Sequence, residues 1–157
     1  MKAVILLIIS MILVNSLAYE RVWAKGDVLL SELQEGEDVL YIVYFSDSTN
    51  TQETYAKVRE NQKVMDKLQD YLKTISPGGD DEFPTKVFFA SVDATDPTNK
   101  NLLSKADIDA DILDDGPAII CLRHGKGYIQ YGAQVNSALK KSVTALKDNS
   151  NEHTYSI

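Results

Sequence analysis

Two apolar segments of the chain have the pattern of strands that are buried on both faces of a sheet. Residues 39–45 are a nearly continuous run of aliphatic, β-branched and aromatic residues, and residues 86–93 are a second apolar segment, interrupted by Ser91 and flanked by Lys86 and Asp93. Such runs are typical of parallel strands with helices on both sides, because half-exposed strands alternate polar and apolar residues instead. The sequence therefore predicts two strands of a parallel portion of a sheet.

Between and after these runs, apolar residues recur at helical spacing. Asp27 is an N-cap candidate for the first helix, which Gly36 would end, and a loop rich in capping residues precedes the second. Four helices are predicted: residues 28–34, from the loop at 46–51 to about residue 75, residues 96–106, and residues 135–146.

A hairpin is predicted near the end of the domain. The apolar run 118–122 and the segment 128–131 flank a tight turn at Gly125–Gly127. Strand–helix–strand units imply parallel pairing, and the hairpin adds antiparallel strands. The predicted class is α/β, with a mixed central sheet of about four to five strands flanked by helices.

The first eighteen residues have a different pattern from the rest. Lys2 precedes an apolar run over residues 3–14, and Ser16 and Ala18 suit a cleavage site after Ala18. A signal peptide is predicted at residues 1–18, and a retained membrane anchor stays open although the run is shorter than the roughly 20 residues of a span. The domain then covers residues 19–147, and residues 148–157 form a polar C-terminal tail predicted to fray.

Composition narrows the possible functions. The chain has 157 residues and a formal net charge of −7. A nucleic-acid-binding protein is not expected, because no excess of Lys or Arg is present to neutralise phosphates. The hydrophobic content of 44% is sufficient for a packed core.

The single cysteine, Cys121, lies inside the apolar run 118–122. One thiol cannot form an intramolecular disulfide. A buried, unreactive strand cysteine is the favoured interpretation, with a reactive thiol or an intermolecular bridge as the alternative.

Few residues suggest a metal site or a resident cofactor. Residues 107–111 alternate aspartates like the start of a calcium loop, but Ile112 and Ala118 replace the glycine and glutamate that an EF-hand requires. His124 and His153 have no nearby cysteine or histidine ligand. A solvated acidic loop, an exposed turn histidine and no cofactor are predicted, and weak calcium binding at the acidic loop stays open.

The order of elements and three local segments resemble the thioredoxin-like superfamily. Residues 39–50 look like its central strand and active-site loop, residues 116–126 like the segment in which a cis-proline begins an apolar strand, and residues 131–133 like the glycine that ends the next strand. The resemblance implies a cis Gly116–Pro117 bond and a groove for extended peptide beside it.

The resemblance also implies that redox chemistry is missing. Redox members carry an acidic residue before the strand-ending aromatic and a Trp-Cys-x-x-Cys segment after it. This chain has Tyr44 at the acidic position, Thr49 at the tryptophan position, and Asn50 and Glu53 at the two cysteine positions. Thiol–disulfide exchange requires a thiolate, so the chain is predicted not to be an enzyme of this kind.

Two functions are predicted, and a non-redox enzyme is a third, disfavoured possibility. The first is a redox-inactive thioredoxin-like protein-binding module of the secretory pathway, in the ER lumen or secreted. The second is a structural accessory subunit of a large membrane assembly, held by an uncleaved N-terminal segment. The expected partner is a protein or peptide, with a membrane contact only if that segment is retained. The candidate binding residues are Ser46, Ser48, Thr49, Asn50, Gly116 and Pro117.

Overall fold

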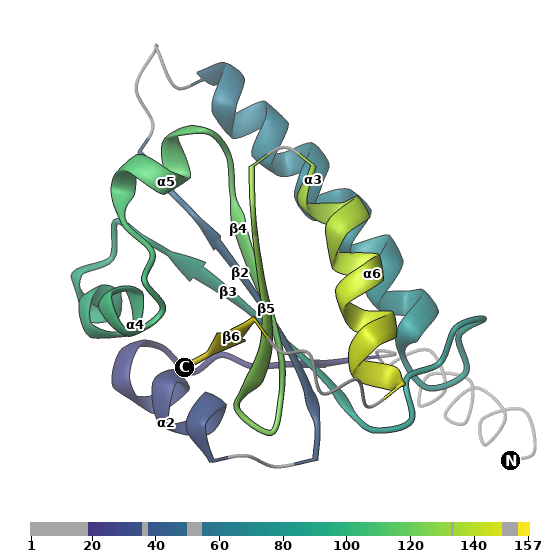
Figure 1. Cartoon of the computed structure of the whole chain (residues 1–157). Helices are drawn as coiled ribbons and strands as arrows, with labels where there is room; N and C mark the ends of the chain where they lie inside the picture. The colour runs from purple at the N-terminus through teal and green to yellow at the C-terminus, as the bar shows by residue number, and fades with distance from the viewer. Residues whose placement is uncertain (1–18, 36–37, 50–54, 133, 149–153) are drawn as a thin grey trace, which may run out of the picture.

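The computed structural model describes residues 19–35, 38–49, 55–132, 134–148 and 154–157 (Figure 1). The strands are β1 (Glu20–Arg21), β2 (Leu40–Ser46), β3 (Val87–Asp93), β4 (Ala118–Arg123), β5 (Lys126–Tyr131) and β6 (Tyr155–Ser156). The helices are α2 (Gly26–Gln34), α3 (Tyr55–Ile75), the 3-10 turn η2 (Pro97–Asn99), α4 (Lys100–Lys105), α5 (Ala110–Asp114) and α6 (Val135–Lys147).

The strands form one six-stranded mixed sheet in the order β1-β3-β2-β4-β5-β6. β3 runs parallel to β1 and β2, whereas β4 is antiparallel to β2 and β5, and β6 is antiparallel to β5. The predicted α/β class with a mixed sheet flanked by helices is confirmed, with six strands in place of four or five. The arrangement is consistent with a thioredoxin-like fold.

The sheet separates two hydrophobic cores. α3 and α6 cover one face, and α2 and α4 lie against the other (Figure 1). Successive residues of central β2 alternate between the cores: Tyr44 packs toward α3, and Phe45 packs on the opposite side. Since each large apolar side chain that leaves water contributes about 1.5–3 kcal/mol, both faces of β2 must be apolar. This double burial explains the unbroken apolar run.

The β4–β5 hairpin closes through a two-residue turn. His124 and Gly125 have φ angles of 55° and 70°, the positive pair that a type I′ turn requires. β5 begins at Lys126, so the turn lies earlier than the predicted one at Gly125–Gly127. Gly127 instead lies within the strand, where a Cβ atom would collide with the Cys121 carbonyl. His124 is exposed, as the sequence indicates.

Contacts distant in sequence determine the start of α2. The helix begins at Gly26, and its N-cap residue Lys25 makes no side-chain capping bond. Asp27 lies in the first turn and accepts a hydrogen bond from Asn101 Nδ2 at 2.7 Å, so its predicted N-cap role is wrong. The Gly26 N–H donates to Asn99 Oδ1 at 2.9 Å. The partner of this helix end therefore comes from a segment more than seventy residues away.

Both edge strands are too short to give a sequence signal. β1 and β6 have two residues each. Tyr155 and Ser156, assigned from sequence to a fraying tail, pair with Gly127 and Lys126, and the Tyr155 hydroxyl donates to the Ala106 carbonyl at 3.2 Å.

None of the helices in the described part of the chain is both long and apolar enough to cross a membrane. The predicted signal segment lies outside the described residues.

Candidate functional site

The candidate site lies where the parallel strands β2 and β3 end. Ser46 is paired in register with Asp93, so the segments that follow, Asp47–Thr49 and Ala94–Asp96, leave the sheet side by side. The Ala94 N–H donates to the Ser46 carbonyl at 2.9 Å, which holds the two exits together. In open α/β sheets, ligands bind at the carboxyl ends of the strands, so polar groups and cavities at this edge are candidates for a binding site.

Asp93 organises the hydroxyl groups at this edge. Ser48 Oγ donates to Asp93 Oδ2 at 2.6 Å, and Thr95 Oγ1 donates to Asp93 Oδ1 at 2.7 Å. Ser48 Oγ and Thr95 Oγ1 are 3.0 Å apart. Burial alone would raise the pKa of Asp93, but the hydrogen bonds from Ser48 and Thr95 outweigh it and hold the pKa below its usual value. Asp93 is therefore an ionised acceptor at neutral pH.

Lys57 connects the loop after β2 with α5. Its Nζ lies 3.8 Å from Asp47 Oδ2 and 3.0 Å from Asp114 Oδ1. Asp47 Oδ1 also accepts the Thr49 N–H at 2.7 Å. Hydrogen bonds from Thr49 and the nearby Lys57 charge lower the pKa of Asp47. The loop that carries Ser48 and Thr49 is thus held from two sides, by Asp93 and by Lys57.

A cavity of about 240 Å³ lies beside this loop, between β2 and α3. The buried Tyr44 hydroxyl donates to the Asn61 carbonyl at 3.1 Å, and burial raises the pKa of Tyr44 to about 12. The cavity combines hydroxyl, amide and apolar groups and has the scale of one or two side chains. Its lining residues are Tyr44, Ser46, Asp47, Ser48, Val58, Asn61, Gln62, Met65 and Ser91.

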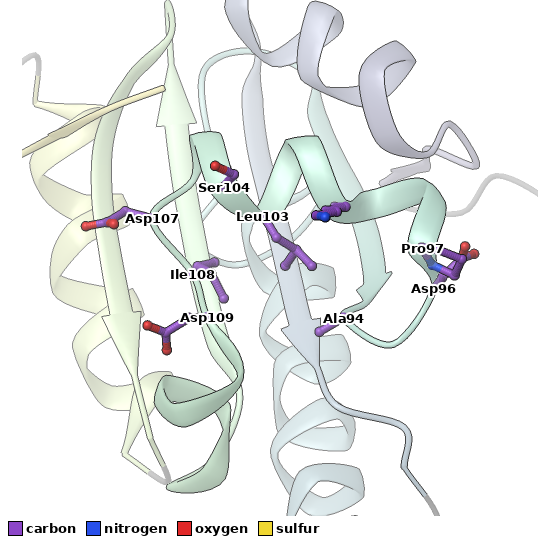
Figure 2. Close-up of a pocket in the computed structure, with 9 residues that line it drawn as sticks. Ala94, Asp96, Pro97, Leu103, Ser104, Asp107, Ile108 and Asp109 are labelled. Carbon is purple, nitrogen blue, oxygen red and sulfur yellow. The ribbon is translucent and has the colours of Figure 1, made fainter.

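A larger cavity of about 550 Å³ opens next to the segment after β3 (Figure 2). Leu103 and Ile108 lie between Asp96 at one end and Asp107 and Asp109 at the other. Two of these carboxylates are engaged locally. Asp109 caps α5 by accepting the Ile112 N–H at 2.9 Å, and hydrogen bonds from Thr98 and Lys25 lower the pKa of Asp96 to about 2. Among the described residues, no group of three or more His, Cys, Asp or Glu side chains could hold a metal ion.

The predicted cis bond at Gly116–Pro117 is wrong. No peptide bond in the described part of the chain is cis. Gly116 adopts a φ of 136°, which only glycine tolerates well, so the chain redirects before Pro117 without a cis bond. Pro117 is buried, and its carbonyl accepts the Gly132 N–H at 3.0 Å. That carbonyl is therefore already engaged within the fold.

The structure brings most of the predicted residues to one end of the sheet. Because Phe45 pairs with Ala118, the backbone at Pro117 lies next to Ser46. Ser46, Ser48 and Thr49 lie at the exit of β2, whereas Asn50 is outside the described residues. Sequence reasoning missed Lys57, Asp93 and Thr95. The position of Asp93 at the end of the second apolar run was the available signal.

Cys121 lies away from this edge, in the core beneath α6. It is fully buried in β4, opposite Ile42 and Tyr128. Burial raises the pKa of its thiol to about 12. The thiol is therefore protonated at neutral pH and shielded from solvent.

Comparison with known proteins bears on the fold. No family model matches the sequence, and no curated protein matches it. Among solved structures, a redox protein from Chlamydomonas reinhardtii is similar, with a TM-score of 0.55 and 15% sequence identity. The match covers 88% of this chain but 38% of that protein. At this identity the likeness shows the fold alone: an α/β architecture with helices on a mixed sheet.

Proposed function

We propose that this chain is a protein-binding module of thioredoxin-like fold without thiol–disulfide exchange activity. The observation that carries the proposal is the state of its single thiol. Exchange begins with attack by an accessible thiolate. Cys121 is fully buried with a pKa of about 12, and the chain contains no second cysteine.

The proposed binding surface is the loop Ser46–Thr49 with the adjoining cavity of about 240 Å³. The cavity has an apolar wall from Val58 and Met65 and a polar rim from Ser46 and Ser48. Small sites of this kind bind a ligand through apolar contact and a few oriented polar groups. An extended segment of a partner would place one side chain here. Asn50 lies outside the described residues, and Gly116 and Pro117 are buried, with the Pro117 backbone next to Ser46.

The absence of exchange activity is tested by insulin reduction and by refolding of a scrambled disulfide protein. Background rates are expected in both assays. Activity above background that disappears in Cys121→Ser would refute this part of the proposal.

Binding is tested by NMR titration of the labelled chain with a reduced, carboxymethylated, unfolded protein. Shifts are expected at residues 46–49, Val58 and Met65. Val58→Glu places a charge in the cavity and should abolish these shifts. Val28→Glu is the matched control, because Val28 is 62% exposed on α2, and Val58 is 37% exposed. Equal binding by both variants would contradict the assigned surface.

We further propose that the module acts in the secretory pathway, since residues 1–18 have the pattern of a signal peptide. N-terminal sequencing of the native protein tests this. A mature start at Tyr19 supports the proposal, whereas an intact Met1 in a membrane fraction favours an anchored accessory subunit.

A further inference from the structure

A third cavity lies in the helical layer and shares no lining residue with the two cavities described above. α3 and α6 lie side by side on one face of the sheet (Figure 1). Their exposed sides enclose a cavity of about 480 Å³. α3 contributes Glu60, Lys63 and Lys67, and α6 contributes Asn136 and Lys140.

Three lysines from the two helices line this cleft. Lys63, Lys67 and Lys140 form no salt bridge with any carboxylate in the described ranges. By contrast, Lys57 and Lys147 are paired with aspartates at 3.0 and 2.8 Å. The chain as a whole carries a net charge of −7. The cleft is therefore a local concentration of positive charge on an acidic protein, and it attracts anionic groups.

Lys140 is oriented by its surroundings. Its Nζ lies 5.5 Å from the centre of the Tyr71 ring, within the range of a cation–π contact. Tyr71 is buried and belongs to the core under α3 and α6. This contact holds the Lys140 ammonium on the side of α6 that faces α3.

The spacing of the α3 lysines suits an extended chain. Lys63 and Lys67 are four residues apart on one helix face, which corresponds to about 6 Å along the axis. In an extended peptide, side chains on the same face recur every two residues, at about 6.6–6.8 Å. Two carboxylates separated by one residue would therefore face the two ammonium groups. Glu60 lies in the same cleft one turn earlier and disfavours a further negative charge at that end.

Asn136 links the two helices that border the cleft. Its Nδ2 donates to the Val64 carbonyl at 3.1 Å, which sets the orientation of the amide. Its Oδ1 is shielded from solvent and has no hydrogen-bond donor among the described residues. The Asn136 side chain therefore connects α6 to the backbone of α3 beside the cleft, and its amide is not a group that a ligand in the cleft contacts.

We propose that the α3–α6 cleft binds an acidic, extended segment of a partner protein, in which Asp or Glu alternates with another residue. The carboxylates pair with Lys63, Lys67 and Lys140. This surface is separate from the loop at Ser46–Thr49, and the proposal does not depend on the function assigned to that loop.

The test is fluorescence anisotropy with a labelled peptide of alternating glutamate and alanine, and a glutamine–alanine peptide as its uncharged counterpart. The full chain should bind the glutamate peptide and not the glutamine peptide, and binding should weaken as salt increases. In the triple variant Lys63→Gln, Lys67→Gln, Lys140→Gln, three ion pairs with the peptide are lost together. Each exposed pair contributes only a factor of about two to three to the affinity, so the variant should bind at least about tenfold more weakly.

The matched control is Lys105→Gln, Lys126→Gln, Lys141→Gln, which removes the same charge from exposed lysines that do not line the cleft. It should retain binding within about twofold of the unmodified chain, the scatter expected for surface changes of this size. An equal loss in both triple variants would overturn the proposal, because it would show attraction to net charge alone. Full displacement of the peptide by equimolar pyrophosphate would also overturn it, in favour of a small-anion site. Self-association that is abolished by the cleft variant would identify a second copy as the occupant and would likewise overturn it.

Discussion

The reactivity of Cys121 gives a quantitative test of the proposed lack of thiol chemistry. Burial raises the pKa of its thiol from 9.0 to about 12. A pKa of about 12 in place of 9.0 lowers the thiolate fraction about a thousandfold, so at pH 8 roughly one thiol in ten is ionised when unfolded and about one in ten thousand when folded. The fully buried side chain also requires local opening before a reagent can reach it.

We therefore expect a charged thiol reagent to modify the native protein at least about a thousandfold more slowly than the denatured protein at the same pH. The assay is stopped-flow absorbance with a polar aromatic disulfide, in buffer and in denaturant. Ser104→Cys in a Cys121→Ser background is the positive control, because Ser104 is exposed on α4. Native and denatured rates for Cys121 within about tenfold of each other would show an accessible thiol and would refute the reasoning.

Three further predictions concern two polar side chains near the site and one close backbone approach in the β4–β5 hairpin. Asn99→Ala leaves the Gly26 N–H and the Asp93 carbonyl without their partner, so the free energy of unfolding measured in urea titrations should fall by about 2–4 kcal/mol. The same change at the exposed Asn101 is the control and should lower it by less than about 1 kcal/mol. The folded pKa of Asp93 lies below its ordinary value of 3.8, so its contribution to stability is present above that pH and is lost as pH falls further. Asp93→Asn should therefore flatten the acid side of the stability profile, and an unchanged profile would contradict this assignment. Gly127→Ala should destabilise the hairpin by more than about 1 kcal/mol, because its methyl group meets the Cys121 carbonyl, and a thermal midpoint equal to that of the unmodified chain would exclude the close approach.

The local pattern of apolar and polar residues was sufficient to predict the helices and strands that have strong periodicity. The double-sided apolar runs identified β2 and β3, and helical spacing identified α3 and α6, because each of these elements buries a continuous apolar surface. The two-residue strands β1 and β6 could not be identified in this way, since two residues carry no period and their pairing comes from the neighbouring strand. The missing cysteines and the isolated thiol were also visible in the sequence.

Tertiary structure alone decided how distant polar residues meet. Ser48 and Asp93 are forty-five residues apart, and Lys57 and Asp114 fifty-seven, yet parallel pairing and helix placement bring each pair within hydrogen-bond distance. The same is true of the α3–α6 cleft, where lysines from two helices face one cavity. The backbone at Pro117 shows most directly what could not be predicted from the sequence. A family resemblance suggested a cis bond, but the positive φ of Gly116 provides the necessary change of direction with a trans bond. Sequence determines which residues must be buried, and only the packing of the elements determines which polar groups those buried surfaces bring together.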